Sequence, residues 1–201
     1  MLPLTDEEVT HGPDIPEVAR MPIVGEVGDA TVRLVDGSVP PVSRHAIARV
    51  AYAAQRSMPS YKTGYDGTVT EDDQRLYVLA AGTRAVGLVL TALQDRFWKI
   101  RWAEDGALVR DSDVPLLQRG PVVARVWVAE SRRKSGLGLG LIDRVLRHLG
   151  VPASGVGWEF PFTESGATLV RRLCPTGFLA SCDAMTLALN TKPLTAPPSA
   201  A

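Results

Sequence analysis

The stretch from residue 122 to residue 150 constrains the fold more than any other part of this 201-residue chain. It opens with the β-prone run VVARVWV at residues 122–128 and becomes polar at residues 130–135. Apolar residues then follow at helical spacing up to Gly150, namely Leu137, Leu141, Ile142, Val145, Leu146 and Leu149. The pattern predicts a strand, a turn and a helix in direct succession.

The turn itself, RRKSGLGLGL at residues 132–141, carries glycines at positions 136, 138 and 140. Glycine removes the side chain where a backbone N–H group must approach an anion, and a helix dipole favours negative charge at its N-terminus. Beside these glycines stand three cations that can pair with phosphate oxygens, Arg132, Arg133 and Lys134. The segment therefore predicts a phosphate-binding turn.

Two other phosphate-binding patterns fit this turn poorly. A dinucleotide fingerprint has the spacing GxGxxG close to the end of its strand, whereas here the spacing is GxGxG and seven residues separate strand and first glycine. A nucleoside-triphosphate loop would end in GK[ST], which this segment does not. The competing interpretation is that the glycines let the helix pack closely on a strand while the cations form a solvated surface.

The rest of the chain predicts a mixed α/β (α+β) fold with a largely antiparallel central sheet flanked by helices. Helical patterns cover residues 43–58, where Ser43 is placed to cap the helix, and residues 165–173. The expected strands are residues 31–35, 76–80, 86–92, 97–102, 122–128 and 156–160, with two closing strands within residues 178–189.

Charge and cysteine content narrow the classes of function. The 22 basic and 22 acidic residues cancel without forming a block of one sign, and no apolar run reaches 18 residues, so we expect neither a nucleic-acid nor a membrane partner. Cys174 and Cys182 do not form a disulfide scaffold or a zinc motif, so we expect core thiols in a reducing cytoplasm and no metal. The expected organisation is an extension at residues 1–21, one domain at residues 22–189 and a tail at residues 190–201.

At the glycine turn the chain resembles the GCN5-related N-acetyltransferases. Their coenzyme A turn reads [QR]xxGx[GA] after a strand, and Arg133, Gly136 and Gly138 occupy those places. The order of the expected elements resembles that family over about residues 22–189. The resemblance implies acetyl-coenzyme A as co-substrate and a splayed cofactor strand whose main chain binds the pantetheine arm. The cofactor-binding residues that it implies are Val126, Trp127, Val128, Arg132, Arg133, Lys134, Ser135, Gly136, Leu137, Gly138, Leu139 and Gly140.

Three segments look like the C-terminal domain of the cohesin acetyltransferases: ARVWV at residues 124–128, RRK at residues 132–134 and FPFTESGATLVRRLCPTGF at residues 160–178. The chain lacks that family's zinc finger and has Ala129 and Glu130 in place of its catalytic serine region. Without the finger it looks like the small bacterial kasugamycin-type aminoglycoside 2′-N-acetyltransferases. The resemblance implies a small cationic amine as substrate and antibiotic resistance as the outcome, and a homodimer is left open.

Amine acetylation needs a neutral amine beside the thioester and a base that takes its proton. Three carboxylates near the expected cofactor strand are candidates for this base: Glu130, Glu159 and Glu164. Each can instead be a solvated charge, and Glu164 can be a favourable first-turn residue of its helix. No tyrosine follows Tyr77, so the general acid stays unassigned.

Substrate contacts are expected from acidic and aromatic side chains. Asp66, Asp72 and Asp73 would attract a cationic substrate, and Trp158 and Phe160 would wall a pocket, although tryptophans are more often core residues. Two alternatives to a small-molecule acetyltransferase stay open. One is a protein lysine acetyltransferase, and the other is a non-catalytic acyl-coenzyme A-binding module.

Overall fold

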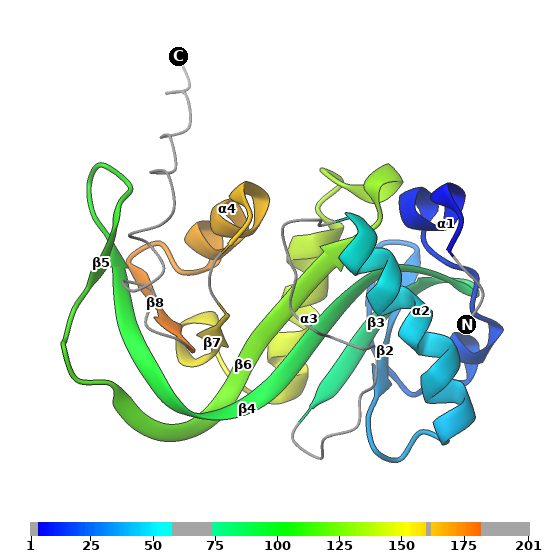
Figure 1. Ribbon diagram of the computed structural model, residues 1–201, viewed down its shortest axis with the longest axis horizontal. Coiled ribbons are helices and arrows are strands. Elements are labelled where there is room, and N and C mark those ends of the chain that lie inside the picture. Colours follow the sequence, from blue (N-terminus) through cyan, green and yellow to red (C-terminus); the bar gives the residue numbers. More distant parts are fainter. Residues whose placement is uncertain (1–3, 58–73, 160–161, 182–201) are drawn as a thin grey trace. The chain divides into compact units, whose positions relative to one another are not determined.

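The computed structural model describes residues 4–57, 74–159 and 162–181 (Figure 1). The helices are α1 (Asp6–His11), α2 (Pro41–Ser57), α3 (Leu137–Leu149) and α4 (Glu164–Leu173), and the short 3-10 turns are η1 (Pro16–Arg20), η2 (Glu130–Arg132) and η3 (Ala153–Gly155). The strands are β1 (Ile23–Val27), β2 (Ala30–Val35), β3 (Arg75–Ala81), β4 (Arg84–Trp102), β5 (Leu108–Arg110), β6 (Leu116–Val128), β7 (Gly157–Trp158) and β8 (Gly177–Ala180).

The strands of the described ranges form one sheet in the order β1-β2-β3-β4-β6-β7-β8, with β5 paired to β4 off that path. Strands β1 to β4 pair antiparallel in sequence order, and β4 also pairs antiparallel with β5 and β8. Parallel pairing joins β7 to β6 and to β8. The predicted mixed α/β class with a mostly antiparallel sheet is confirmed.

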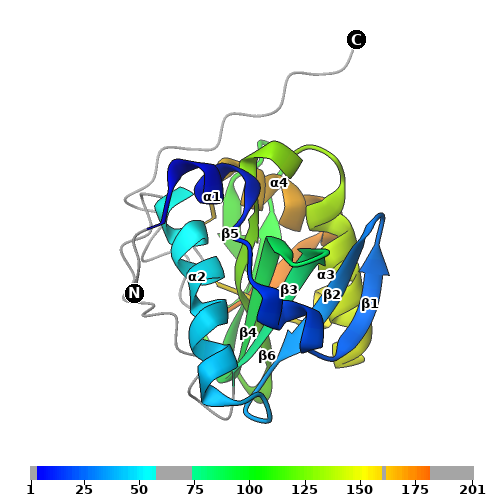
Figure 2. The ribbon, with the colours of Figure 1, turned by 90° about the vertical axis from the view of Figure 1, so that its right-hand side faces the viewer.

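Two compact units share the long strands β4 and β6. The described residues of the first unit lie within residues 1–92 and 124–150, and those of the second lie within residues 93–123 and 151–201. In the first unit, α2 and α3 cover opposite faces of the sheet (Figure 2). Adjacent side chains of a strand point to opposite faces of its sheet, and β6 shows this. Trp127 Nε1 donates to Ser57 Oγ of α2 over 2.6 Å, whereas the side chain of Val128 lies beside Gly138 of α3.

Helix α3 begins and ends where the sequence predicts, at residues 137 and 149. Gly136 precedes it with φ 83° and Gly150 follows it with φ 69°, both in the left-handed region that favours glycine. One stripe of the helix is buried: Leu137, Leu141, Ile142, Val145 and Leu146. None of the described helices is long and apolar enough to span a membrane.

Several element boundaries differ from the prediction. The strands expected at residues 86–92 and 97–102 are one continuous strand, β4, because the exposed residues 93–96 between them include no glycine or proline that would end the pairing. Strand β6 begins at Leu116, six residues earlier than expected. Helix α2 begins at Pro41 rather than Ser43, since proline suits the first turn of a helix.

Strands β1 and β5 were not predicted, because Gly25 interrupts the alternation of β1 and because β5 has only three residues. Strand β7 covers residues 157–158 of the expected 156–160. Of the closing strands expected within residues 178–189, β8 is described, while residues 182–189 lie outside the described part. Helix α4 begins at Glu164, one residue before its expected start, with Thr163 as the N-cap.

Residues 6–21 pack as part of the first unit, so the expectation that residues 1–21 lie outside the core is wrong for them. Three side chains of this segment are buried at a spacing of three: Ile15, Val18 and Met21. Asp14 forms a β-bridge with Arg84, and Glu8 of α1 forms an ion pair with Arg49 of α2. The prolines between the short elements conceal this packing in the sequence.

The core of the second unit is aromatic. Phe97 and Trp158 are 1% and 2% exposed, and Gly157 lies directly against the ring of Phe97. Trp102 Nε1 donates to the carbonyl of Cys174 over 2.9 Å, which ties β4 to the end of α4.

Cys174 is buried as predicted, whereas Cys182 lies outside the described residues. Burial raises the pKa of the Cys174 thiol to about 11, so the reactive thiolate is scarce at lower pH. In a Cys182→Ser variant we expect iodoacetamide at about pH 8 to label the native protein far more slowly than an ordinary thiol of pKa about 8.5. Full labelling should require a denaturant, and rapid labelling of the native protein would contradict the burial.

Candidate functional site

The turn between β6 and α3 has an unusual backbone. Lys134 has φ 62°, the only positive φ of a non-glycine residue in the described part of the chain, and Gly136 follows with φ 83°. Residues 133–136 are exposed, so nothing in the core forces this conformation. Such backbone conformations collect at ligand-binding sites, where the geometry of the main chain serves the ligand.

The start of α3 offers three N–H groups that have no acceptor within the helix. The first intrahelical bond runs from Gly140 N–H to the Gly136 carbonyl at 3.0 Å, so the N–H groups of Leu137, Gly138 and Leu139 precede it. Gly136 is the N-cap and has no side chain that could accept from them. These donors and the positive end of the helix dipole lie at one exposed turn, which is an arrangement that binds anions.

The three glycines of the turn differ in what a side chain at each position would contact. A Cβ at Gly136 would meet no atom within 4 Å, and one at Gly138 would lie 3.6 Å from Val128 Cγ2. A Cβ at Gly140 would overlap Cγ1 of Val27 in β1, and the N–H of Gly140 is already bonded inside the helix. The prediction that all three glycines expose N–H groups to an anion is therefore wrong for Gly140, where the competing interpretation of close helix-on-strand packing holds.

The cations of the turn differ in their partners. Arg132 Nη1 lies 3.5 Å from Asp29 Oδ2. Arg133 Nε donates to the Val128 carbonyl over 3.0 Å, and its Nη1 lies 3.6 Å from Glu130 Oε1. Arg133 thus ties the turn back to the end of β6. Lys134 is exposed at the tip of the turn, next to Ser135, whose Oγ donates to the Arg132 carbonyl.

Strand β6 supplies main-chain groups beyond its pairing with β7. The described residues of β7 pair with β6 at Val122 and Val123 only, and the bond from Glu159 N–H to the Val123 carbonyl follows at 3.0 Å. The pairing of β6 with β7 thus ends before Val126, Trp127 and Val128. Val126 and Val128 are half-buried. The Trp127 side chain is 2% exposed, and its carbonyl oxygen lies 3.0 Å from the position of a Cβ at Gly87 of β4, so a cofactor role for Trp127 stays a prediction.

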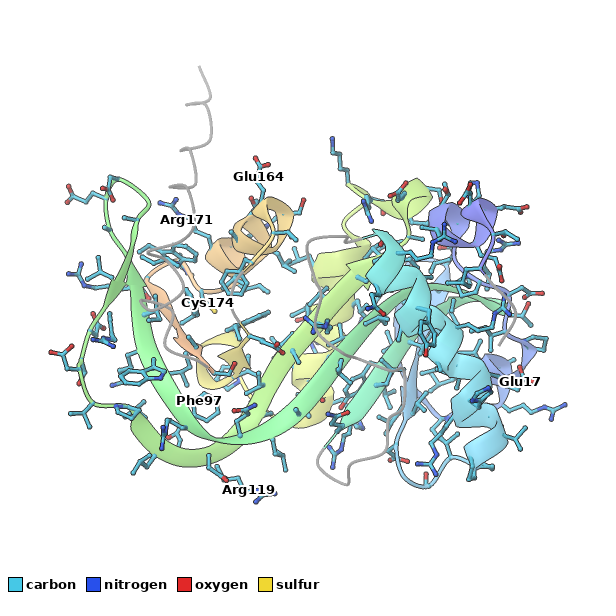
Figure 3. The ribbon with its side chains drawn as sticks, in the orientation of Figure 1. Glu17, Phe97, Arg119, Glu164, Arg171 and Cys174 are labelled. Atoms are coloured by element: carbon cyan, nitrogen blue, oxygen red, sulfur yellow. The ribbon has the colours of Figure 1, made fainter. Side chains whose placement is uncertain are left out.

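The three candidate carboxylates are divided between the units. Glu130 begins η2 in the first unit, where Arg133 pairs with it. Glu159 follows β7 in the second unit and is half-buried. Glu164 is the first residue of α4 and is exposed, with its side chain extending away from the helix (Figure 3). Its position suits a helix dipole, so its role as a base stays a prediction.

Of the predicted substrate residues, Asp66, Asp72, Asp73 and Phe160 lie outside the described residues. Trp158 is 2% exposed, and its Nε1 donates to the Ala153 carbonyl over 3.4 Å. This burial agrees with the core alternative for Trp158. No group of His, Cys, Asp or Glu side chains among the described residues is arranged to hold a metal ion.

Sequence reasoning missed the contribution of the β1–β2 hairpin to this site. Val27 packs on Gly140, Asp29 pairs with Arg132, and Arg144 Nε donates to the Glu26 carbonyl over 3.0 Å. The dipeptide Gly28-Asp29 is a turn signal that could have located the hairpin, but no local pattern predicts that its tip lies against α3.

Solved structures share this fold. The xEco2 acetyltransferase domain bound to a K105-CoA conjugate matches with a TM-score of 0.65 at 14% sequence identity, covering 80% of this chain and 96% of that chain. A second structure of the xEco2 acetyltransferase domain matches with a TM-score of 0.63 at 14% identity, covering 80% and 95%. No family model and no curated protein matches the sequence. At this identity the likeness shows the fold alone, and it agrees with the expected mixed α/β fold with a mostly antiparallel sheet.

Proposed function

We propose that the chain is an acetyl-coenzyme A-dependent N-acetyltransferase that transfers the acetyl group directly to an amine. The observation that carries this proposal is the turn between β6 and α3. It combines two left-handed residues, three N–H groups at the start of α3 and exposed cations, in a fold also found in an acetyltransferase domain bound to a CoA conjugate. None of these features alone specifies the cofactor, but an extended diphosphate ligand uses all of them.

The turn suits a pyrophosphate in shape as well as in charge. The space beside Gly136 is open, whereas a side chain there would stand between an anion and the N–H groups of Leu137 and Gly138. Lys134 at the tip adds a mobile point charge, and Val126 and Val128 offer main-chain groups to the pantetheine arm. Acetyl-coenzyme A, when bound, supplies the acetyl group as a thioester.

The protein's own task is then to orient the acceptor amine and to remove its proton. As the new carbon–nitrogen bond forms and the carbon–sulfur bond breaks, the amine loses one proton and the departing sulfur gains one. We assign the first transfer to Glu164, with Glu159 and Glu130 as the other candidates. Glu130 is the weakest of the three, because its carboxylate is paired with Arg133. The donor for the sulfur is unassigned.

For the acceptor we propose a small cationic amine, an aminoglycoside with a kasugamycin-like 2′-amine, so that acetylation in the cytoplasm would confer resistance. The support is the resemblance to the small bacterial enzymes that have this domain without a zinc finger, together with the acidic residues expected on the acceptor side, Asp66, Asp72 and Asp73. A protein lysine is the second candidate acceptor. It is favoured by the structural neighbour whose bound ligand is a K105-CoA conjugate.

A thiol-release assay with acetyl-coenzyme A tests these acceptors. One panel contains aminoglycosides including kasugamycin, and the other contains lysine peptides. Release with an aminoglycoside supports the first acceptor, and release with a peptide supports the second. Coenzyme A binding by calorimetry without release in either panel would overturn both acceptors and leave the non-catalytic binding module.

Glu164→Gln is expected to lower the turnover number by about 100-fold, the usual contribution of a general base, while coenzyme A binding stays unchanged. The matched control is Glu104→Gln, which removes an exposed carboxylate from the turn after β4 in the same unit. If the only role of Glu164 is to stabilise the N-terminus of α4 through the helix dipole, the variant should lose about 0.5 kcal/mol of stability and keep its turnover. Turnover and thermal unfolding of both variants separate the two roles.

A further inference from the structure

The tip of the β1–β2 hairpin, residues 27–29, lies against the start of α3 and the cofactor turn. Val27 fills the space that a Cβ at Gly140 would need, and Leu137 Cδ2 lies 3.9 Å from the position of a Cβ at Gly28. On the same side of α3, Arg144 Nε donates to the Glu26 carbonyl over 3.0 Å. Packing and hydrogen bonding thus hold the hairpin tip on the helix.

This packing places Asp29 beside the turn. The register pairs Val27 with Ala30, so Gly28 and Asp29 form a two-residue turn, and φ 61° at Gly28 is the conformation that such turns require. Asp29 Oδ2 lies 3.5 Å from Arg132 Nη1, and the two side chains are 67% and 41% exposed. The fold therefore presents an anionic group to an arginine of the proposed phosphate site.

We propose that Asp29 competes with the cofactor's phosphate for Arg132, and so sets the affinity for coenzyme A. This inference rests on the proposed function. Asp29 contacts Arg132 through Nη1, so a phosphate that binds bidentately through Nη1 displaces the carboxylate from that nitrogen. An exposed ion pair is weak enough to be exchanged in this way. Release of the carboxylate leaves Asp29 in solvent, where its exposure allows full hydration.

The alternative role for Asp29 is to hold Arg132 in a productive position. The two roles predict opposite effects of Asp29→Asn. Competition predicts tighter coenzyme A binding, by about three- to tenfold, because the competitor and one negative charge are both removed. Positioning predicts weaker binding, because Arg132 would lose its partner.

The matched control is Asp143→Asn. Asp143 lies on α3 and pairs with Arg147 at 3.0 Å, with comparable exposure, so this variant makes the same change in charge without touching the turn. We expect its dissociation constant for coenzyme A to stay within about twofold of the parent value, because Asp143 lies six residues along α3 from Leu137, about 9 Å of helix rise, where salt already screens an exposed charge. Equal tightening in both variants would show a general charge effect and overturn the proposal.

The experiment measures coenzyme A binding by calorimetry for the parent, Asp29→Asn, Asp143→Asn, Arg132→Gln and the double variant Asp29→Asn/Arg132→Gln. Competition predicts that Asp29→Asn tightens binding in the parent and has no effect in the Arg132→Gln background. Weaker or unchanged binding in Asp29→Asn, when the parent binds, overturns this inference and leaves the proposed function standing. A parent protein that does not bind coenzyme A overturns the proposed function and this inference with it.

Discussion

Gly136→Val is expected to abolish detectable coenzyme A binding while the protein stays folded. The side chain would stand beside the N–H groups of Leu137 and Gly138, in space that no protein atom occupies within 4 Å. Hydrogen bonds to charged groups contribute about 1.5–3 kcal/mol each, so losing two of them lowers affinity by more than about 100-fold. The left-handed φ of 83° adds a strain of about 1–2 kcal/mol, which acts on stability rather than on binding.

Gly150→Val is the matched control for this prediction. Gly150 ends the same helix with φ 69°, and a Cβ there also meets no atom within 4 Å. The backbone strain is therefore similar, but this position lies at the opposite end of α3 from the proposed phosphate site. Calorimetric titration with coenzyme A and thermal unfolding should show equal losses of stability and a loss of binding in Gly136→Val only. Normal binding by Gly136→Val would rule out the turn as the pyrophosphate site.

Gly157→Ala is expected to destabilise the second unit strongly. A Cβ at Gly157 would overlap Cε1 of Phe97 and lie 2.8 Å from Phe97 Cδ1 and 2.9 Å from Val122 Cγ2. Phe97 is 1% exposed and Val122 is equally buried, so neither side chain has room to withdraw. Overpacking of this kind costs about 1–3 kcal/mol, and the melting temperature should fall by about 2–12 °C.

The control for this second prediction is Gly37→Ala, because a Cβ there meets no atom within 4 Å. Its melting temperature should equal that of the parent or exceed it slightly, since alanine restricts the unfolded chain. A double variant, Gly157→Ala/Phe97→Leu, should lose less stability than the sum of the two single variants, because the smaller side chain relieves the overlap. Strict additivity would mean that Phe97 is not the obstacle.

The parts of the fold that the sequence predicted well are those in which the local signal is complete. Helix α3 has a glycine at each end and one uninterrupted apolar stripe, so both its boundaries were predicted to the residue. Helix α4 has a threonine N-cap and an acidic first residue, and its boundary was missed by one position. Local chemistry decides these elements before any tertiary contact forms.

Strand β4 and the N-terminal segment show where local signals fail. The exposed residues 93–96 interrupt the alternation that identifies a strand, yet pairing with neighbouring strands keeps the backbone extended through them. The short elements before residue 22 become ordered because Ile15, Val18 and Met21 find a core that other segments provide. Neither the continuity of β4 nor the order of the N-terminal segment can be predicted from the local sequence, because both depend on contacts with other segments.

Local sequence signals were enough to predict the glycine turn, the helix that follows it and the order of elements that resembles an acetyltransferase. The separate roles of the residues in the turn depend on how distant segments pack together. Gly140 is a glycine because Val27 packs on it, and Arg132 meets Asp29 about a hundred positions earlier in the chain. These are contacts between segments that no periodicity connects, so their existence depends on how α3 and the β1–β2 hairpin are packed.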